Sequence, residues 1–305
     1  MGAVMRFSGT YTALITPFRD GKLDVPAYQS LIERQIAGGV DGIVPCGTTG
    51  ESPTLDTNEH LEVIRLAVEF AAGRCEVVAG TGANATAEAI ELTVAAEKLG
   101  ATGSLQVCPY YNKPSQEGLY RHFKAIAEAT SLPLVLYSIP GRSAIEIATE
   151  TTARLAADCP NIAAIKEAGG SVDRVNQLVQ VVPEDFAILC GDDPLTLPFI
   201  ACGASGLVSV ASNLIPDVIA RLVRACLNGS FDEALVIQKH YYPLMRGLMS
   251  IEVNPVPIKS AIALQGHCTP EFRLPLAPLS EDQTSKLTTL LESFNLLPTP
   301  IDSNR

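Results

Sequence analysis

One lysine in this chain stands where covalent chemistry is possible. Lys166 ends an apolar run that begins at Ile162, and Glu167 and two glycines follow within four residues. The run has the length of a buried strand, and burial disfavours the charged form of an amine. A neutral amine in such a place can form a Schiff base with a carbonyl substrate. The alternative is a structural lysine that extends its charge to solvent or pairs with Glu167.

Hydroxyl groups and one guanidinium also follow short apolar runs. Thr48 and Thr49 follow one run, Tyr111 follows another, and Tyr137 and Arg142 lie at the end of a third. Hydroxyls can pass protons, and a guanidinium matches the geometry of a carboxylate. Each residue also has a structural explanation taken singly, because such turns often cap helices and buried tyrosines often belong to the core. Whether all these residues lie at one place in the fold decides between the catalytic and the structural explanation.

The elements that would position these residues alternate along the chain. Apolar runs that end in glycine or proline predict strands at 11–16, 42–46, 76–79, 103–108, 132–137, 162–166, 186–190 and 206–210. Amphipathic stretches between them predict helices at 25–37, 58–72, 85–99, 116–129 and 149–157. Strands that alternate with helices indicate a parallel sheet, and a repeat of this length favours a closed (β/α)8 barrel over an open sheet.

The last part of the chain loses the strand pattern. Helical stretches at 231–249, 257–264 and 280–291 predict a C-terminal helical appendage after a barrel domain, with the division at 1–229 and 230–305. Pro298 and Pro300 predict a loosely held end. In a (β/α)8 barrel the active site lies at the carboxyl ends of the strands, so Lys166 and the hydroxyl groups are expected to converge there.

Composition excludes several classes of protein. A 305-residue chain with 47% hydrophobic residues can bury a large core, and a net charge of -11 argues against a nucleic-acid surface. No apolar stretch is long enough for a membrane span, and the start of the sequence lacks the pattern of a secretory signal, so we expect a cytoplasmic protein. Eight cysteines and four histidines show no metal-ligand spacing, which predicts reduced structural thiols and a site without metal or cofactor.

Several motifs resemble the dihydrodipicolinate synthase family. They are residues 47–51 (GTTGE), 109–114 (PYYNKP), 136–142 (LYSIPGR) and 165–168 (IKEA), in that order. The resemblance extends from about Gly9 to Leu297 and includes 79–84 (AGTGAN) and 254–259 (NPVPIK). It implies a (β/α)8 barrel with a helical C-terminal domain that condenses pyruvate with L-aspartate 4-semialdehyde, the first committed step toward diaminopimelate and L-lysine.

The resemblance also assigns roles to individual residues. It implies that Lys166 carries pyruvate as an imine and that Tyr137, Thr48 and Tyr111 form a hydroxyl proton relay. Tyr111 would reach into the site of a neighbouring subunit, which requires at least a dimer, and the family is usually tetrameric. Arg142 would bind the semialdehyde carboxylate and stabilise Tyr111. The pyruvate moiety would be positioned by Thr49 and by backbone groups near Gly191 and Val208.

An inhibitor site for L-lysine is implied in part. The matching positions are Ser52, His60, Asn84, Glu88 and Tyr110, with Glu88 suited to an ammonium group and Asn84 to the carboxylate end. Pro53 and Thr57 depart from the pattern of sensitive bacterial members, where alanine and histidine are typical, so we expect feedback inhibition that is weakened. The alternative is that His60 and Glu88 are ordinary helix-surface residues.

Other departures lie beside Arg142. Ser138 stands where asparagine is frequent, and Ser143-Ala144 replaces a threonine-glycine pair. These changes bear on the second substrate and leave the imine machinery untouched. N-acetylneuraminate lyase and the sugar-acid aldolases resemble the chain in the imine lysine and form the alternative function. Thr48, Thr49, Tyr111 and Arg142 together favour the synthase, because the sugar lyases usually differ at these positions. An inactive barrel kept for metabolite binding is a further alternative.

Overall fold

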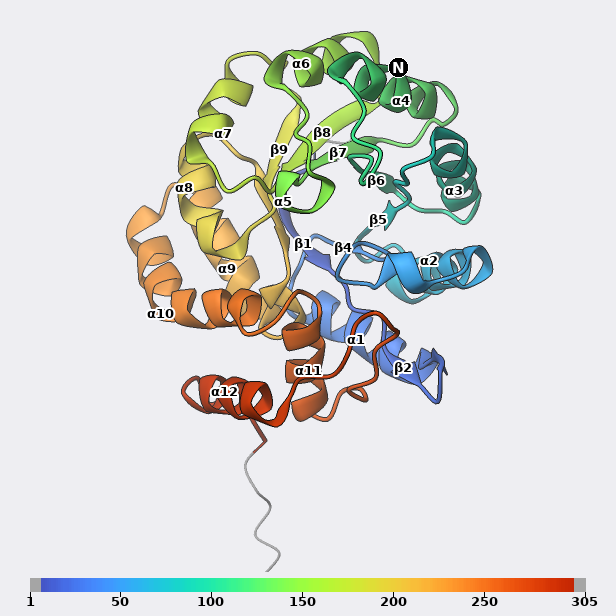
Figure 1. Ribbon diagram of the computed structural model, residues 1–305. Coiled ribbons are helices and arrows are strands. Elements are labelled where there is room, and N and C mark those ends of the chain that lie inside the picture. Colours follow the sequence, from blue (N-terminus) through green and yellow to red (C-terminus); the bar gives the residue numbers. More distant parts are fainter. Residues whose placement is uncertain (1–6, 299–305) are drawn as a thin grey trace, which may run out of the picture.

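Eight parallel strands close into a barrel in the computed structural model, which describes residues 7–298 (Figure 1). In chain order they are β1 (Gly9–Ala13), β4 (Gly42–Val44), β5 (Glu76–Gly80), β6 (Gly103–Val107), β7 (Leu134–Ser138), β8 (Ile162–Glu167), β9 (Ala187–Cys190) and β10 (Gly206–Ser209). Each strand pairs with the next along the chain, and β10 pairs with β1 to close the barrel. Every predicted run overlaps a strand, so the predicted (β/α)8 barrel is confirmed.

Helices surround the barrel because each parallel strand needs a crossover to reach the next. They are α1 (Val25–Ala37), α2 (Thr57–Ala71), α3 (Thr86–Lys98), α4 (Gln116–Glu128), α5 (Pro140–Ser143), α6 (Thr149–Asp158), α7 (Val172–Val179), α8 (Thr196–Ala201) and α9 (Pro216–Leu227). Side-chain caps begin several of them, as at Ser115 before α4 and Ser171 before α7. The five predicted helices are confirmed, and the hairpin of β2 (Phe18–Arg19) and β3 (Lys22–Leu23) was not predicted.

The two ends of the barrel interior differ. Near the amino ends of the strands, the rings of Phe7 and Tyr11 lie edge to face at 6.0 Å and fill the interior. Tyr11 also donates a hydrogen bond of 2.6 Å to Glu76, the first residue of β5. Large rings therefore close this end of the barrel, and the polar side chains named above are left to the carboxyl ends.

Three helices follow the barrel: α10 (Phe231–Ser250), α11 (Val256–Leu264) and α12 (Glu281–Glu292). Figure 1 shows them in orange and red, side by side against the part of the barrel formed by α9 and α1. Helix α10 contacts α8 and α9, and α11 contacts the short turn Ala211–Asn213 that follows β10. The predicted C-terminal helices are confirmed, while the division at residue 230 stays a prediction and Pro300 lies outside the described residues.

Two further observations concern the chain as a whole. Within residues 7–298, none of the helices has both the length and the apolar character that a membrane crossing demands. All eight cysteines are free, and Cys46, Cys108 and Cys190 are buried in the core. These thiols therefore behave as small apolar side chains.

Candidate functional site

Lys166 points into the barrel. Side chains alternate along β8, so that Ala164 lies in the interior cluster and Ile165 lies in the outer core. Lys166 is 6% exposed, and its Nζ lies 4.1 Å from the centroid of the Tyr137 ring on the neighbouring strand. Among residues 7–298, no carboxylate lies within ion-pair distance of this amine. The alternative of a solvent-exposed lysine or a pair with Glu167 is therefore wrong.

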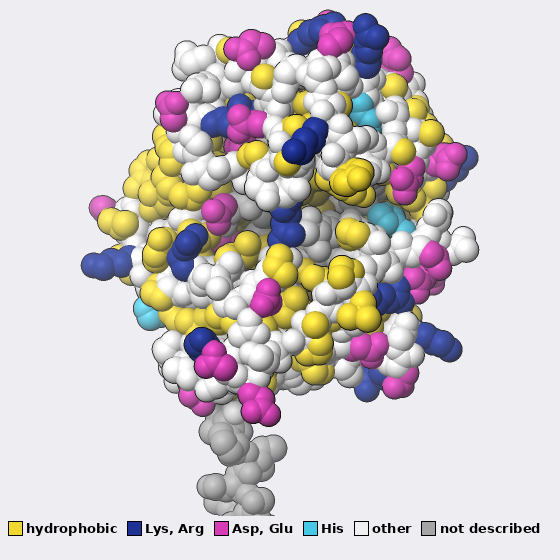
Figure 2. All heavy atoms as spheres, in the orientation of Figure 1, with side chains coloured by type: hydrophobic (Ala, Val, Ile, Leu, Met, Phe, Trp, Pro, Cys, Tyr) yellow, Lys and Arg dark blue, Asp and Glu magenta, His cyan; other side chains and the backbone are white. Residues whose placement is uncertain are grey.

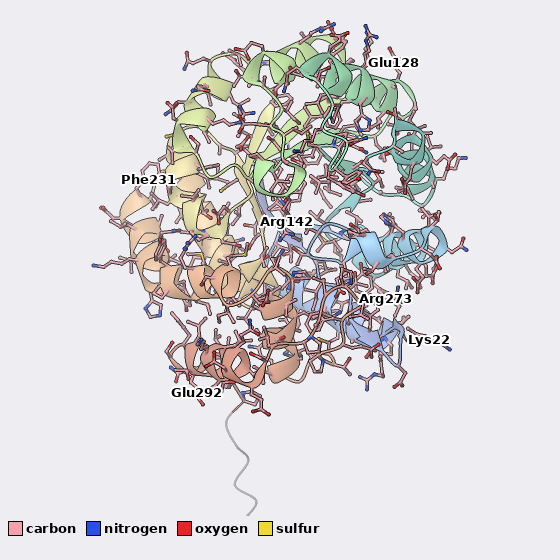
Figure 3. The ribbon with its side chains drawn as sticks, viewed as in Figure 1. Lys22, Glu128, Arg142, Phe231, Arg273 and Glu292 are labelled. Carbon is pink, nitrogen blue, oxygen red and sulfur yellow. The ribbon has the colours of Figure 1, made fainter. Side chains whose placement is uncertain are left out.

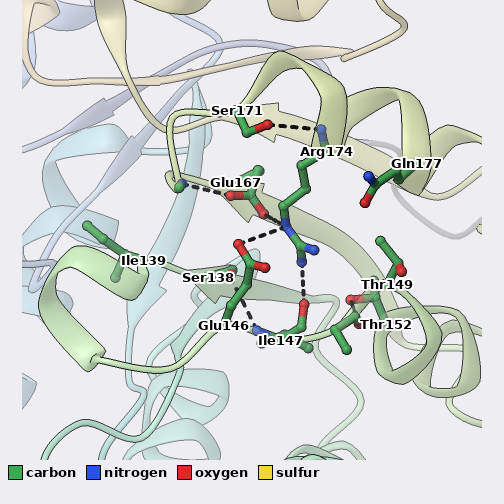
Figure 4. Close-up of polar contacts among 12 residues, drawn as sticks. Ser138, Ile139, Glu146, Ile147, Thr149, Thr152, Glu167, Ser171, Arg174 and Gln177 are labelled. Atoms are coloured by element: carbon green, nitrogen blue, oxygen red, sulfur yellow. Dashed lines mark hydrogen bonds and ion pairs between the residues drawn. The ribbon is translucent and has the colours of Figure 1, made fainter.

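Glu167 points to the opposite side of β8 and is bound to Arg174 instead. Arg174 Nε donates to Glu167 Oε2 at 2.7 Å, and both side chains are buried (Figure 4). Arg174 also donates to the carbonyl of Ile147 and lies 3.4 Å from Glu146. Burial raises the pKa of the Glu167 carboxyl, and the Arg174 charge opposes that rise. The pair therefore holds the carboxyl end of β8 on the side of the strand opposite to Lys166.

Gly191 leaves room for the lysine side chain. Its N–H donates to the carbonyl of Glu167 at 2.8 Å, which holds the end of β9 against β8. A Cβ at position 191 would lie 3.1 Å from Lys166 Cε and 2.6 Å from Ala168 Cβ. A larger residue would therefore collide with the lysine or with the strand end, and glycine is required here for space.

The turn after β4 carries two threonines, of which Thr48 lines the cavities at the barrel mouth and Thr49 is 3% exposed. Cys46 and Glu51 flank it in the left-handed region, with φ of 55° and 56°. The hydroxyl of Thr16 donates to Gly50 O at 2.7 Å and holds the turn from below. Thr48 and Tyr137 line one small cavity together with Gly47 and Gly80.

A segment of the C-terminal helices reaches this turn. Asn254, which precedes α11, donates from Nδ2 to Thr49 Oγ1 at 3.0 Å, and its carbonyl accepts from Arg142 Nη2 at 3.0 Å. Lys259 on α11 forms an ion pair of 2.6 Å with Glu51, and both side chains are fully buried. Figure 3 shows Arg142 on α5, between the barrel mouth and the C-terminal helices. Thr49 and Arg142 are thus joined through one asparagine.

Sequence reasoning assigned no role to Asn254, Glu51, Lys259 or Arg174. One signal was available, because Lys259 is a charged residue within the apolar stretch of α11. A buried charge needs a partner, so this position predicts an ion pair. Its partner Glu51 lies 208 residues away in the sequence, and only the packing of the C-terminal helices identifies it.

A cavity of about 350 Å³ opens at the barrel mouth. Figure 2 shows a depression near the centre of this face, with basic and apolar side chains around it. Its lining joins part of the predicted catalytic set to part of the predicted inhibitor site, and includes Thr48, Arg142, Ser52, His60, Glu88 and Tyr110. Asn84 follows the lining residue Ala83 but does not itself line the cavity.

His60 is not the ordinary surface residue of the alternative reading. It is 7% exposed, and its Nε2 lies 2.8 Å from the carbonyl of Gly80, to which the ring N–H donates. Burial lowers the pKa of the His60 imidazole. A neutral ring held in this way presents fixed polar and apolar surface to the cavity. Glu88, by contrast, is exposed at the start of α3.

Several predicted residues do not line this cavity, namely Lys166, Tyr137, Thr49, Gly191, Tyr111 and Val208. Tyr137 lines the smaller cavity together with Thr48, whereas Lys166 lines neither of the two. Tyr111 is 90% exposed, with φ of 71°, and does not line the cavity that holds Thr48 and Arg142. Val208 is buried in the barrel interior, where β10 pairs with β1 at Tyr11. No cluster of three His, Cys, Asp or Glu side chains suited to a metal ion is found in the described part of the chain.

The fold and the mouth together define a class of protein. A (β/α)8 barrel with a buried lysine amine, a tyrosine ring beneath it and hydroxyls beside it has the parts of a barrel enzyme that reacts through a lysine imine. The chain belongs to the dihydrodipicolinate synthetase family, whose model matches residues 6–294.

Named relatives cover nearly the whole chain. The 4-hydroxy-tetrahydrodipicolinate synthase of Persephonella marina is 51% identical over 95% of this chain and 99% of its own length. The solved structure of that synthase from Methylacidiphilum fumariolicum SolV has a TM-score of 0.93 and 55% identity, covering 95% of this chain and 96% of the other. A structure from Cyanidioschyzon merolae with lysine bound has a TM-score of 0.92 and 41% identity, covering 95% and 99%.

Proposed function

We propose that the protein is a 4-hydroxy-tetrahydrodipicolinate synthase, a lyase that condenses pyruvate with L-aspartate 4-semialdehyde. The observation that carries the proposal is the Lys166 amine, which is buried at the barrel mouth without a carboxylate partner among the described residues. The names of the relatives, at about half identity over nearly the full chain, point to the same reaction.

Lys166 acts as the nucleophile. Its Nζ attacks the ketone carbon of pyruvate, and loss of water leaves a protonated imine that withdraws electrons from the neighbouring methyl group. Loss of a methyl proton gives an enamine, whose carbon attacks the aldehyde of the semialdehyde. The amino group of the semialdehyde portion then attacks the imine carbon, which closes the ring and releases the Lys166 amine. The imine is itself the electron sink, so the steps need no metal or organic cofactor.

Tyr137 and Thr48 move the protons that these steps release and consume. Both side chains line the same small cavity at the end of β7, next to the lysine amine. A hydroxyl within reach of a reacting group can serve as acid and base in turn. With no histidine beside Lys166 in this arrangement, hydroxyl groups carry the relay.

Tyr111 completes the relay from a second copy of the chain. Its ring is 90% exposed, its backbone lies in the left-handed region, and it does not line the cavity of its own chain, although the neighbouring Tyr110 does. A large aromatic side chain in this position is suited to a partner surface. We expect the working unit to be at least a dimer, with a tetramer formed from two such dimers.

Mixing two inactive variants tests the shared site. A Lys166→Ala chain keeps Tyr111, and a Tyr111→Phe chain keeps Lys166, so a hybrid dimer regains one complete site if Tyr111 acts in the partner. We expect activity to reappear when the two are mixed under conditions that exchange subunits. If Tyr111 acts within its own chain, no hybrid contains a complete site and no activity returns.

Arg142 binds the carboxylate of the semialdehyde, while Thr49 and backbone groups at Gly191 and Val208 hold pyruvate. A planar guanidinium fork fits a carboxylate, and Arg142 lines the open part of the cavity. Loss of a charged hydrogen bond costs about 1.5–3 kcal/mol, so Arg142→Ala should raise the KM for the semialdehyde about 10–100-fold. An unchanged KM for the semialdehyde would remove this role.

L-lysine binds in the adjoining part of the cavity. Ser52, His60, Glu88 and Tyr110 line it, and Asn84 lies next in sequence to a lining residue. The relative from Cyanidioschyzon merolae was solved with lysine bound. Pro53 and Thr57 also line the cavity here, and they offer no side-chain N–H to the ligand, which fits a weakened inhibition. Calorimetric titration with L-lysine should give a heat of binding that Glu88→Gln reduces.

Borohydride reduction decides the main proposal. Reduction in the presence of pyruvate, followed by peptide mass spectrometry, should place an adduct on Lys166. Turnover should then require aspartate semialdehyde, whereas turnover of N-acetylmannosamine alone would favour the sugar-lyase alternative. A wild-type protein that forms no adduct would be an inactive barrel.

A further inference from the structure

Asn254, in the segment that joins two of the C-terminal helices, contacts the hydroxyl of Thr49, a predicted substrate-binding residue. It is 7% exposed and lies in the segment between α10 and α11. Its Nδ2 donates to Thr49 Oγ1 at 3.0 Å, across 205 residues of sequence. The contact is buried, so neither partner can exchange it freely for water.

The direction of this hydrogen bond decides what the Thr49 hydroxyl can do. An amide nitrogen only donates, so the hydroxyl oxygen of Thr49 accepts and its hydrogen stays available for another acceptor. Two neighbouring threonines differ in this respect. Thr16 donates its hydroxyl hydrogen to Gly50 O at 2.7 Å, and Thr54 donates to Glu51 O at 3.0 Å. Their hydrogens are used within the fold, whereas that of Thr49 has no acceptor among residues 7–298.

The position of Asn254 is itself fixed on two sides. Its backbone carbonyl accepts from Arg142 Nη2, and five residues later Lys259 is paired with buried Glu51 of the threonine turn. Glu51 Oε2 accepts a further bond of 3.2 Å from the N–H of Arg273. These contacts hold the backbone of residues 254–259 against the turn and keep the Asn254 amide within hydrogen-bond reach of Thr49.

We propose that Asn254 is a positioning residue that orients the Thr49 hydroxyl as a hydrogen-bond donor to the carboxylate of bound pyruvate. This inference rests on the proposed function, because it takes pyruvate as the ligand. The Asn254 side chain acts through Thr49, and its backbone acts on Arg142. Removal of the side chain should therefore weaken pyruvate binding and leave the semialdehyde site intact.

The test is a double-mutant cycle read in two KM values. Asn254→Ala should raise the KM for pyruvate about twofold to tenfold, the worth of one net hydrogen bond, with the KM for the semialdehyde unchanged. Thr49→Val should raise the KM for pyruvate at least as much. In the Thr49→Val background, Asn254→Ala should add nothing, because the hydroxyl that it orients is gone.

Asn254→Asp tests the direction of the bond without a change in size. A carboxylate accepts the hydrogen of Thr49 and removes it from the ligand, so this variant should raise the KM for pyruvate more than Asn254→Ala. Most of that extra effect should vanish in the Thr49→Val background. If the effect of aspartate persists there in full, charge repulsion explains it and the orienting role is overturned.

Asn161→Ala is the matched control. Asn161 donates three hydrogen bonds to backbone carbonyls and lies just before β8, away from the mouth. Its loss should lower the melting temperature and leave both KM values unchanged. Additive effects of Asn254→Ala and Thr49→Val, or an unchanged KM for pyruvate in Asn254→Ala, would overturn the inference. Absence of any imine in the wild-type protein would overturn the proposed function, and this inference with it.

Discussion

Two buried lysines in this chain invite direct comparison. Lys166 at the barrel mouth is 6% exposed and Lys259 on α11 is 0% exposed. Each amine lies over an aromatic ring, Lys166 at 4.1 Å from the Tyr137 centroid and Lys259 at 4.2 Å from that of Phe18. They differ in their charged partners, since Lys259 has Glu51 at 2.6 Å and Lys166 has no carboxylate within ion-pair distance among residues 7–298.

The difference shows that burial and an aromatic neighbour do not by themselves make a lysine reactive. To form an imine, Lys259 would have to leave Glu51 as an uncompensated buried charge, which is costly. Burial lowers the pKa of Lys259, and Glu51 opposes this. Lys166 has no such partner among the described residues, and the Tyr137 ring beside its amine lines a cavity together with Thr48. The partner and the cavity, taken together, separate a structural lysine from a catalytic one.

Removing the lysine that we propose to form the imine should have the largest effect. Lys166→Ala should lower kcat for condensation by at least about a thousandfold, because the covalent route is lost. The fold should survive, since Lys166 forms no ion pair. Borohydride trapping with pyruvate should give no adduct anywhere, although Lys259 remains. An adduct on Lys259 in this variant would show that burial is sufficient after all.

Replacing the Tyr137 ring beneath Lys166 by a phenylalanine ring, like the one beneath Lys259, should have the next largest effect. Tyr137→Phe keeps a ring beneath Lys166, as Phe18 lies beneath Lys259, but removes the hydroxyl. We expect kcat to fall about 10²–10⁴-fold, the usual contribution of a positioned acid and base. The imine with pyruvate should still form slowly and be trapped. Full activity in Tyr137→Phe would mean that only the ring matters.

Breaking the structural pair should reduce stability rather than chemistry. Lys259→Met leaves Glu51 charged and buried, and should lower the free energy of unfolding by about 3–5 kcal/mol. Urea denaturation measures this loss. In the folded protein at low temperature, pyruvate should still be trapped on Lys166. A variant as stable as wild type would show that the pair contributes nothing to the fold.

Removing both charges should have the smallest effect. Glu51→Gln combined with Lys259→Met leaves no buried charge, and a glutamine oxygen can still accept the bond from the N–H of Arg273. Its free energy of unfolding should exceed that of Lys259→Met by about 2 kcal/mol. If the double variant is instead the less stable of the two, Glu51 has a favourable contact other than Lys259.

Much of the fold could be predicted because its signals are local. Apolar runs of strand length and amphipathic stretches alternate, and each predicted run overlaps a strand of the barrel. Lys166, Thr48 and Tyr137 could be placed together by one rule, that carboxyl ends of parallel strands share one face. The prediction that Arg142 joins them follows from the same rule, since α5 continues directly from β7.

The contacts made by the C-terminal helices could not be predicted in this way. Asn254 and Thr49 are 205 residues apart, and no periodicity links them. The hairpin of β2 and β3 was missed because its strands have only two residues each. Arg174 was missed because its sequence position gives no hint that it lies behind β8, where it binds Glu167. Such pairings depend on packing of distant segments, not on residue type alone.

The side chains of Lys166 and Glu167 point to opposite sides of β8, and this has a consequence for protein engineering. Neighbouring positions on β8 are constrained for unrelated reasons, one by chemistry inside the barrel and the other by its arginine partner outside. In a library that randomises this strand, most variants would lose either the Lys166 amine or the Glu167–Arg174 ion pair. They would be inactive or unstable before any new substrate is tested. Diversity introduced in the loops around Tyr111 and Arg142 leaves the reactive amine aimed as it is. Altered substrate choice should therefore be sought in those loops.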